Sequence, residues 1–136
     1  MVKVILGLKG SGKTKQLIDS INSAIKEEAG SVVCIEKGNA LTFDVDYRVR
    51  LINASEYDIG SYEFLKGFIS GLHAGNFDIT QIFVDGLYKL AGTNDNDATA
   101  DFLAWCDAFG KANGMKFTLS ISADAAGLPE SITKYQ

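Results

Sequence analysis

The chain has 136 residues, of which 46% are hydrophobic and 22% charged, a balance typical of one globular domain rather than a disordered segment. Its formal net charge of -4 argues against an extended nucleic-acid-binding surface, because such a surface needs clustered Lys and Arg. No apolar run approaches the roughly 18 residues that span a bilayer. We therefore expect a single domain over residues 1–136 in a reducing cytoplasm, with Cys34 and Cys106 as small buried side chains.

The first informative stretch is residues 7–14, GLKGSGKT, which fit the pattern G-x-x-x-x-G-K-[ST] and directly follow an apolar run at residues 2–6. Glycines in this pattern let successive backbone N–H groups point into one concavity that suits phosphate oxygens. Apolar residues at helical spacing between positions 17 and 25 predict a helix from about Lys13 to Glu28, ended by Gly30. Its free first-turn N–H groups would face the same concavity. The alternative is a glycine-rich turn with an incidental lysine.

The pattern is that of a phosphate-binding loop, the Walker A motif. Lys13 would reach the β- and γ-phosphates of a nucleotide, and the Thr14 hydroxyl would ligate Mg²⁺. The expected cofactors are therefore ATP, or another nucleoside triphosphate, and Mg²⁺. The candidate nucleotide-binding residues in this stretch are Gly7, Lys9, Gly10, Ser11, Gly12, Lys13 and Thr14.

The next elements follow from apolar periodicity. Residues 31–36 form an unbroken apolar run that ends in Glu36, which predicts a buried strand. Residues 41–52 alternate apolar and polar side chains, so we expect an extended segment that bends or forms a small hairpin near 44–46 and joins the sheet over 48–52. A loop at residues 53–57 and an amphipathic helix over about 61–74 should follow.

Residues 80–85 form the second informative stretch, an apolar strand that ends in Asp85 and has the form of a Walker B motif. Ligands of open parallel sheets bind beyond the carboxyl ends of the strands. Asp85 would then lie at the same edge as Thr14 and help it to hold Mg²⁺. The alternative is an aspartate that only starts a turn before Gly86.

The last part of the chain predicts a polar loop, a helix, a strand and a short helix. Residues 88–97 should form a loop at the ligand edge, either a lid or a plain connection. Asn96 or Asp97 is expected to cap a helix that runs to about residue 113. Residues 116–122 alternate as a strand with one polar face, and Pro129 can open a short last helix.

This alternation predicts an α/β fold, a three-layer α/β/α sandwich with a mostly parallel five-stranded sheet. Asp85 follows Lys13 by 72 positions (85 minus 13), with about two strands between them. In this the chain resembles the RecA-like group of P-loop NTPases, in which an additional strand lies between the Walker A and Walker B strands. The resemblance covers the whole chain as an architecture, but only residues 7–14 and 82–85 as motifs.

The resemblance implies catalytic roles for Lys13, Asp85 and a glutamate that polarises water. Many members carry that glutamate directly after the Walker B aspartate, where this chain has Gly86. Glu36, at the end of a strand, is the remaining candidate base. Ser122, or Ser120, would correspond to the polar residue that senses the γ-phosphate; a hydroxyl satisfied within the strand is the alternative.

The sequence favours a Mg²⁺-dependent ATP-binding protein with weak ATPase activity. Its only arginines are Arg48 and Arg50, so turnover would depend on a neighbouring subunit of a homo-oligomer or on a protein partner. ATP is preferred over GTP because no N-K-x-D motif is present. The alternatives are a nucleotide-operated switch without useful turnover and a small-molecule kinase, although the 88–97 loop has Lys89 as its only basic residue.

Overall fold

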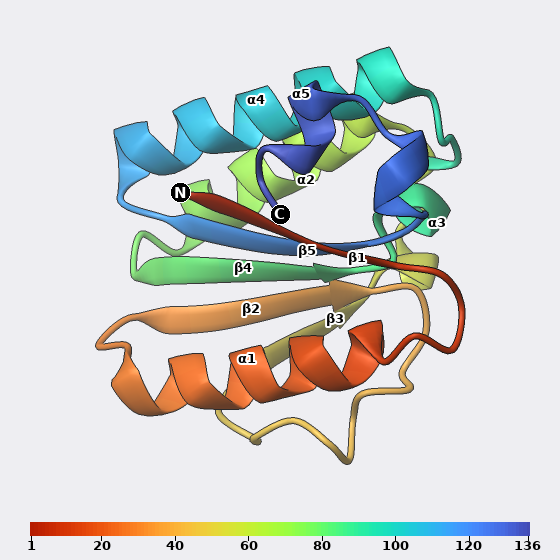
Figure 1. Cartoon of the computed structure of the whole chain (residues 1–136). Helices are drawn as coiled ribbons and strands as arrows, with labels where there is room; N and C mark the ends of the chain where they lie inside the picture. The colour runs from red at the N-terminus through yellow and green to blue at the C-terminus, as the bar shows by residue number, and fades with distance from the viewer.

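Five parallel strands form one sheet at the centre of the computed structural model, which describes residues 1–136. Figure 1 shows α1 on one face of this sheet and the remaining helices on the other, so the chain folds as the predicted three-layer sandwich. The strands are β1 (Val2–Gly7), β2 (Ser31–Glu36), β3 (Arg50–Asn53), β4 (Ile79–Asp85) and β5 (Lys116–Ser122). The helices are α1 (Lys13–Glu27), α2 (Tyr62–Gly75), α3 (Leu87–Ala91), α4 (Asn96–Asn113) and α5 (Glu130–Thr133), with 3₁₀ turns η1 (Ala54–Glu56) and η2 (Ala125–Gly127).

The strands lie in the order β1-β5-β4-β2-β3. The last strand in sequence, β5, therefore separates β1 from β4, the strand that ends in Asp85. Gly7 is in register with Ser122, and Glu36 is in register with Asp85. The carboxyl ends of four strands thus meet at one edge of the sheet.

The sheet separates two hydrophobic cores. The larger contains 24 buried residues and packs under α2, α3, α4 and α5, whereas the smaller contains 10 and packs under α1. Neighbouring residues of β4 alternate between them, with Ile82 and Val84 in the larger core and Phe83 in the smaller. Cover on both faces explains the apolar runs at residues 32–35 of β2 and 82–84 of β4. Both cysteines are free and buried, as predicted. No helix combines the length and the apolar character that crossing a membrane requires.

The extended conformation predicted for residues 41–52 is wrong over most of its length. Only Arg50–Asn53 is a strand, and residues 41–49 form successive turns and bends. Leu41, Val45 and Val49 are buried against α1, while Phe43 and Tyr47 are 97% and 93% exposed. Burial therefore recurs at every fourth residue instead of every second.

Side chains supply the hydrogen bonds that a strand ladder would otherwise give this segment. The Asn22 amide of α1 donates to the Asp44 carbonyl at 3.1 Å and accepts from the Asp46 N–H at 2.9 Å. The Glu36 carboxylate accepts from the N–H groups of Ala40 and Leu41. With its backbone groups satisfied in this way, the segment can turn instead of extending.

The polar loop predicted for residues 88–97 is also largely wrong, because Leu87–Ala91 forms the helix α3. Gly86 and Gly92 flank it with φ of 77° and 70°, and Leu87 and Leu90 are fully buried. Only residues 92–95 remain irregular. The cap of α4 is Asp95, whose side chain accepts from the Ala98 N–H at 2.9 Å, and not Asn96 or Asp97.

Candidate functional site

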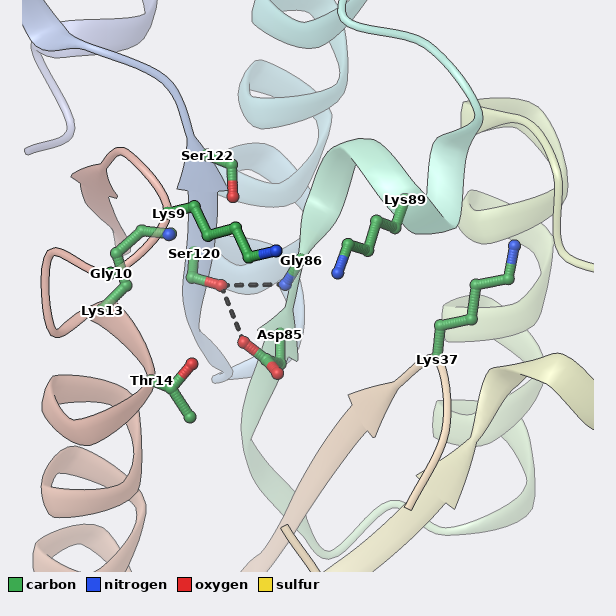
Figure 2. Close-up of a pocket in the computed structure, with 10 residues that line it drawn as sticks. All are labelled: Lys9, Gly10, Lys13, Thr14, Lys37, Asp85, Gly86, Lys89, Ser120 and Ser122. Atoms are coloured by element: carbon green, nitrogen blue, oxygen red, sulfur yellow. Dashed lines mark hydrogen bonds between the residues drawn. The ribbon is translucent and has the colours of Figure 1, made fainter. Parts of the chain in front are cut away.

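A cavity of about 450 Å³ lies at the carboxyl edge of the sheet (Figure 2). It is bounded by the β1–α1 loop (residues 8–12), the start of α1, the residue that follows β2, the β4–α3 junction and the end of β5. No hydrophobic residue lines it. The lining residues are Lys9, Gly10, Lys13, Thr14, Lys37, Asp85, Gly86, Lys89, Ser120 and Ser122.

The β1–α1 loop leaves the first turn of α1 open to this cavity. Gly10 and Gly12 have φ of 83° and 90°, a left-handed conformation that favours glycine. Gly12 precedes α1, and no side chain caps the helix. The N–H groups of the first turn are therefore free of a capping partner, and they carry the positive end of the helix dipole.

Gly7 allows the loop to fold closely on itself, because a Cβ at this position would collide with Ser11 Oγ. The Ser11 N–H donates to the Leu8 carbonyl at 3.0 Å, and Lys13 Nζ donates to the same oxygen at 3.4 Å. The cavity thus brings together Lys9, Gly10, Lys13 and Thr14 of the predicted set. Gly7, Ser11 and Gly12 shape the loop but do not line the cavity.

Asp85 is held in place from the neighbouring strand. The Gly86 N–H donates to Ser120 Oγ at 2.8 Å, and the Ser120 hydroxyl donates to Asp85 Oδ1 at 3.1 Å (Figure 2). Ser120 is only 1% exposed, so this network lies at the floor of the cavity. Ser122, the serine favoured by the sequence, is exposed at the rim. Ser120 is thus the strand-end serine that contacts a predicted site residue.

Four lysines and a single carboxylate are part of the cavity lining. Lys9, Lys13, Lys37 and Lys89 line it, and none of them forms an ion pair. The lining therefore carries an excess of positive charge in a chain whose net charge is -4. Cavities lined by one sign of charge concentrate ions of the opposite sign. The sequence analysis did not select Lys37 or Lys89, although the position of Lys37 directly after a strand was a usable signal.

Glu36 lies beside Asp85 in the sheet but does not line the cavity. It is 4% exposed, and its two carboxylate oxygens accept from the N–H groups of Ala40 at 3.0 Å and Leu41 at 3.3 Å. The pKa of Glu36 is raised above its ordinary value, mainly by burial and also by the nearby Asp85 charge. The two backbone hydrogen bonds oppose this shift but do not reverse it. The carboxylate is thus committed to the turn that follows β2. Its role as a catalytic base stays a prediction.

The two arginines lie away from the cavity. Arg48 and Arg50 line a different hollow together with Ser31 and Ile79, the first residues of β2 and β4. Because all strands are parallel, their first residues lie at the edge opposite Asp85. Neither arginine is placed to contact a ligand of the lysine-lined cavity in the same chain.

The oxygen donors of the cavity fit Mg²⁺. The Thr14 hydroxyl and the Asp85 carboxylate come from opposite walls and face the same space (Figure 2). No group of three or more His, Cys, Asp or Glu side chains is present that could hold a metal by itself. Mg²⁺ does not need one, since it commonly binds through one or two protein oxygens and completes its shell with water and phosphate oxygens.

No protein-family model matches the chain, and no curated protein matches it.

Proposed function

We propose that the chain binds ATP, or another nucleoside triphosphate, together with Mg²⁺ in the lysine-lined cavity and hydrolyses it slowly. The observation that supports this most is that an uncapped helix start, four lysines without an ion pair and one carboxylate line the same cavity, which has no hydrophobic wall. Free N–H groups and ammonium groups bind phosphate oxygens, and the carboxylate gives a place for the metal that accompanies them. The strand order, with β5 between β1 and β4, agrees with the RecA-like arrangement.

In this proposal each residue has one task. The first-turn N–H groups of α1 and the Lys13 ammonium hold the β- and γ-phosphates, and Lys13 leaves the Leu8 carbonyl to do so. Thr14 and Asp85 hold Mg²⁺, which neutralises phosphate charge when bound. Ser120 keeps the Asp85 carboxylate oriented through its hydrogen bond. Two buried free cysteines are compatible with a cytoplasmic location.

Turnover by the isolated chain should be slow. The position after Asp85 is Gly86, the Glu36 carboxylate is occupied by two backbone N–H groups, and Arg48 lies at the opposite edge. An arginine that contacts the transferred phosphoryl group contributes about 10³- to 10⁵-fold in rate. A second copy of the chain or a protein partner would have to supply it. The same three observations favour a second candidate, a nucleotide-operated switch that binds without useful turnover.

Calorimetric titration of Mg-ATP into the native chain and into the Lys13→Ala variant tests binding. We expect the variant to lose binding while its circular dichroism and melting temperature stay those of the native chain. Lys26→Ala removes an exposed lysine from the last turn of the same helix and should bind like the native chain. Unchanged affinity in Lys13→Ala would contradict the proposal.

Single-turnover hydrolysis with excess protein separates the slow enzyme from the switch. An enzyme releases phosphate from bound ATP faster than ATP hydrolyses in solution, whereas a switch does not. The Lys13→Ala variant is the control for contaminating ATPases, because it should release phosphate only at the rate of uncatalysed ATP hydrolysis in solution.

A further inference from the structure

The lining of the cavity shows which part of a nucleotide it can recognise. Small-molecule pockets are lined mainly by hydrophobic and aromatic side chains, which pack against the flat faces of a ligand such as a nucleobase. Here all ten lining residues are glycine, lysine, serine, threonine or aspartate. Nothing in this set can stack on a base or surround it with apolar surface. The contacts on offer are those that phosphate oxygens use.

Two of the lysines form a wall opposite the β1–α1 loop. Figure 2 shows Lys9 and Lys13 on one side of the cavity and Lys37 and Lys89 on the other. A phosphate chain lying between the walls would meet ammonium groups from both sides. Charge-assisted hydrogen bonds of this kind are roughly twice as strong as those between neutral groups.

Lys37 is positioned by the turn that follows β2. The Glu36 carboxylate accepts from the N–H groups of Ala40 and Leu41, and the Gly38 N–H donates to Asn53 Oδ1 at 2.9 Å. The residues on both sides of Lys37 are therefore anchored. The buried carboxylate that could have served as a base instead fixes the backbone that carries one of the lysines of the cavity lining.

Lys89 is positioned by the turn at Gly86. Gly86 has φ of 77°, and the Lys89 N–H donates to its carbonyl at 3.1 Å. A Cβ built on Gly86 would lie 3.7 Å from Lys89 Cδ and 4.0 Å from Cγ, so the aliphatic stem of Lys89 passes over the glycine. Its ammonium group extends toward the cavity (Figure 2). A Cβ at these distances would only touch the stem, so it is the positive φ that favours glycine at position 86.

We propose that the site recognises the triphosphate chain itself, with Lys37 and Lys89 as phosphate contacts on the wall opposite the β1–α1 loop. The substrate class is then any nucleoside triphosphate, and inorganic triphosphate binds as well because the base and sugar contribute little. This inference rests on the proposed function, since it concerns the same cavity.

The test is calorimetric titration of the native chain with the Mg²⁺ complexes of ATP, GTP, CTP, UTP and inorganic triphosphate. We expect the four nucleotides to agree within about threefold in Kd, and inorganic triphosphate to bind within about tenfold of ATP. The Lys37→Ala and Lys89→Ala variants should each weaken all five ligands by the same factor, about tenfold, the scale of one hydrogen bond to a charged group. The Lys26→Ala control should bind all five like the native chain.

Each outcome separates this inference from the proposed function. Binding of ATP with more than about thirtyfold weaker binding of inorganic triphosphate would overturn the inference and leave the proposed function standing. The same holds if Lys37→Ala and Lys89→Ala bind ATP as well as Lys26→Ala does. If none of the five ligands binds the native chain, both are wrong.

Discussion

Replacing Ser120 with alanine should weaken both the fold and the metal-dependent part of ATP binding. The Ser120 hydroxyl accepts from the Gly86 N–H at 2.8 Å and donates to Asp85 Oδ1 at 3.1 Å. Alanine removes both hydrogen bonds and leaves the part-buried Gly86 N–H without its protein partner. The Asp85 carboxylate then loses the contact that orients it.

The size of the stability loss follows from the partner that is left behind. A buried donor without an acceptor costs about 1–3 kcal/mol. Unfolding entropy of about 2.1 cal/mol/K per residue gives about 0.29 kcal/mol/K for 136 residues, so a loss of 2 kcal/mol lowers the melting temperature by about 7 °C. Differential scanning calorimetry resolves such a change easily.

A matched control lies two residues earlier on the same strand. Thr118 points to the same face of β5 and is 9% exposed, but its hydroxyl makes no hydrogen bond to another residue. Thr118→Val keeps the shape of the side chain and should lower the melting temperature by less than about 2 °C. A fall of similar size in both variants would mean that packing at β5, and not the Ser120 network, carries the effect.

Binding supplies the functional readout of the same variant. The ratio of the ATP affinity measured with Mg²⁺ to the ATP affinity measured with a chelator gives the metal-dependent gain in affinity. This ratio should fall about tenfold in Ser120→Ala and should equal that of the native chain in Thr118→Val. A melting temperature within about 1 °C of the native value, or an unchanged metal-dependent gain, would refute the assigned role of Ser120.

Two further predictions concern α2, the helix that packs on the larger core. Gly71→Ala in the exposed face of α2 should raise the free energy of unfolding by about 0.5–1 kcal/mol, measured by urea denaturation, because an added Cβ meets nothing within 4 Å; a lower stability would show that the position is strained. Burial raises the pKa of Tyr62 to about 12, so above pH 10 the unfolded chain loses a proton that the fold retains, and stability falls. Denaturation between pH 10 and 12 should show a steeper fall for the native chain than for Tyr62→Phe, and equal slopes would contradict this.

The architecture and the site edge could be predicted because both depend on local patterns. Apolar runs at residues 32–35 and 82–84 identify β2 and β4, and the parallel arrangement then brings Asp85 to the edge where β1 ends. The placement of Thr14 and Asp85 on one cavity follows from strand direction alone. Strand ends are constrained by topology, so their residues can be assigned to an edge without knowledge of side-chain contacts.

Residues 41–49 could not be predicted because their conformation depends on distant side chains. The alternation of apolar residues is real, but Phe43 and Tyr47 are exposed while Leu41 and Val45 are buried. The hydrogen bonds of Asn22 to Asp44 and Asp46 connect two segments separated by more than twenty positions. The alternation of apolar and polar residues therefore predicted neither the backbone conformation of this segment nor which of its side chains are buried.

The helix α3 and the second lysine wall were hidden for a different reason. Five residues are too few for a helical period to emerge, and the signal is instead the pair Gly86 and Gly92, whose positive φ values begin and end the helix. Once α3 exists, Lys89 extends over Gly86 into the cavity. Its place in the site depends on a turn conformation that composition alone does not specify.

The position of Glu36 bears on two parts of the proposed function, the binding of phosphate and the slow hydrolysis of the nucleotide. A carboxylate at the end of β2 could either polarise a water molecule or hold the following turn. Here each oxygen accepts from one backbone N–H of that turn, and the side chain is buried outside the cavity lining. Releasing it for catalysis would leave two N–H groups without partners and would loosen the turn that carries Lys37. Under the proposed function, Glu36 would therefore support phosphate binding through Lys37 rather than activation of water. Fast hydrolysis would require groups from outside this chain, because its own arginines lie at the opposite edge of the sheet.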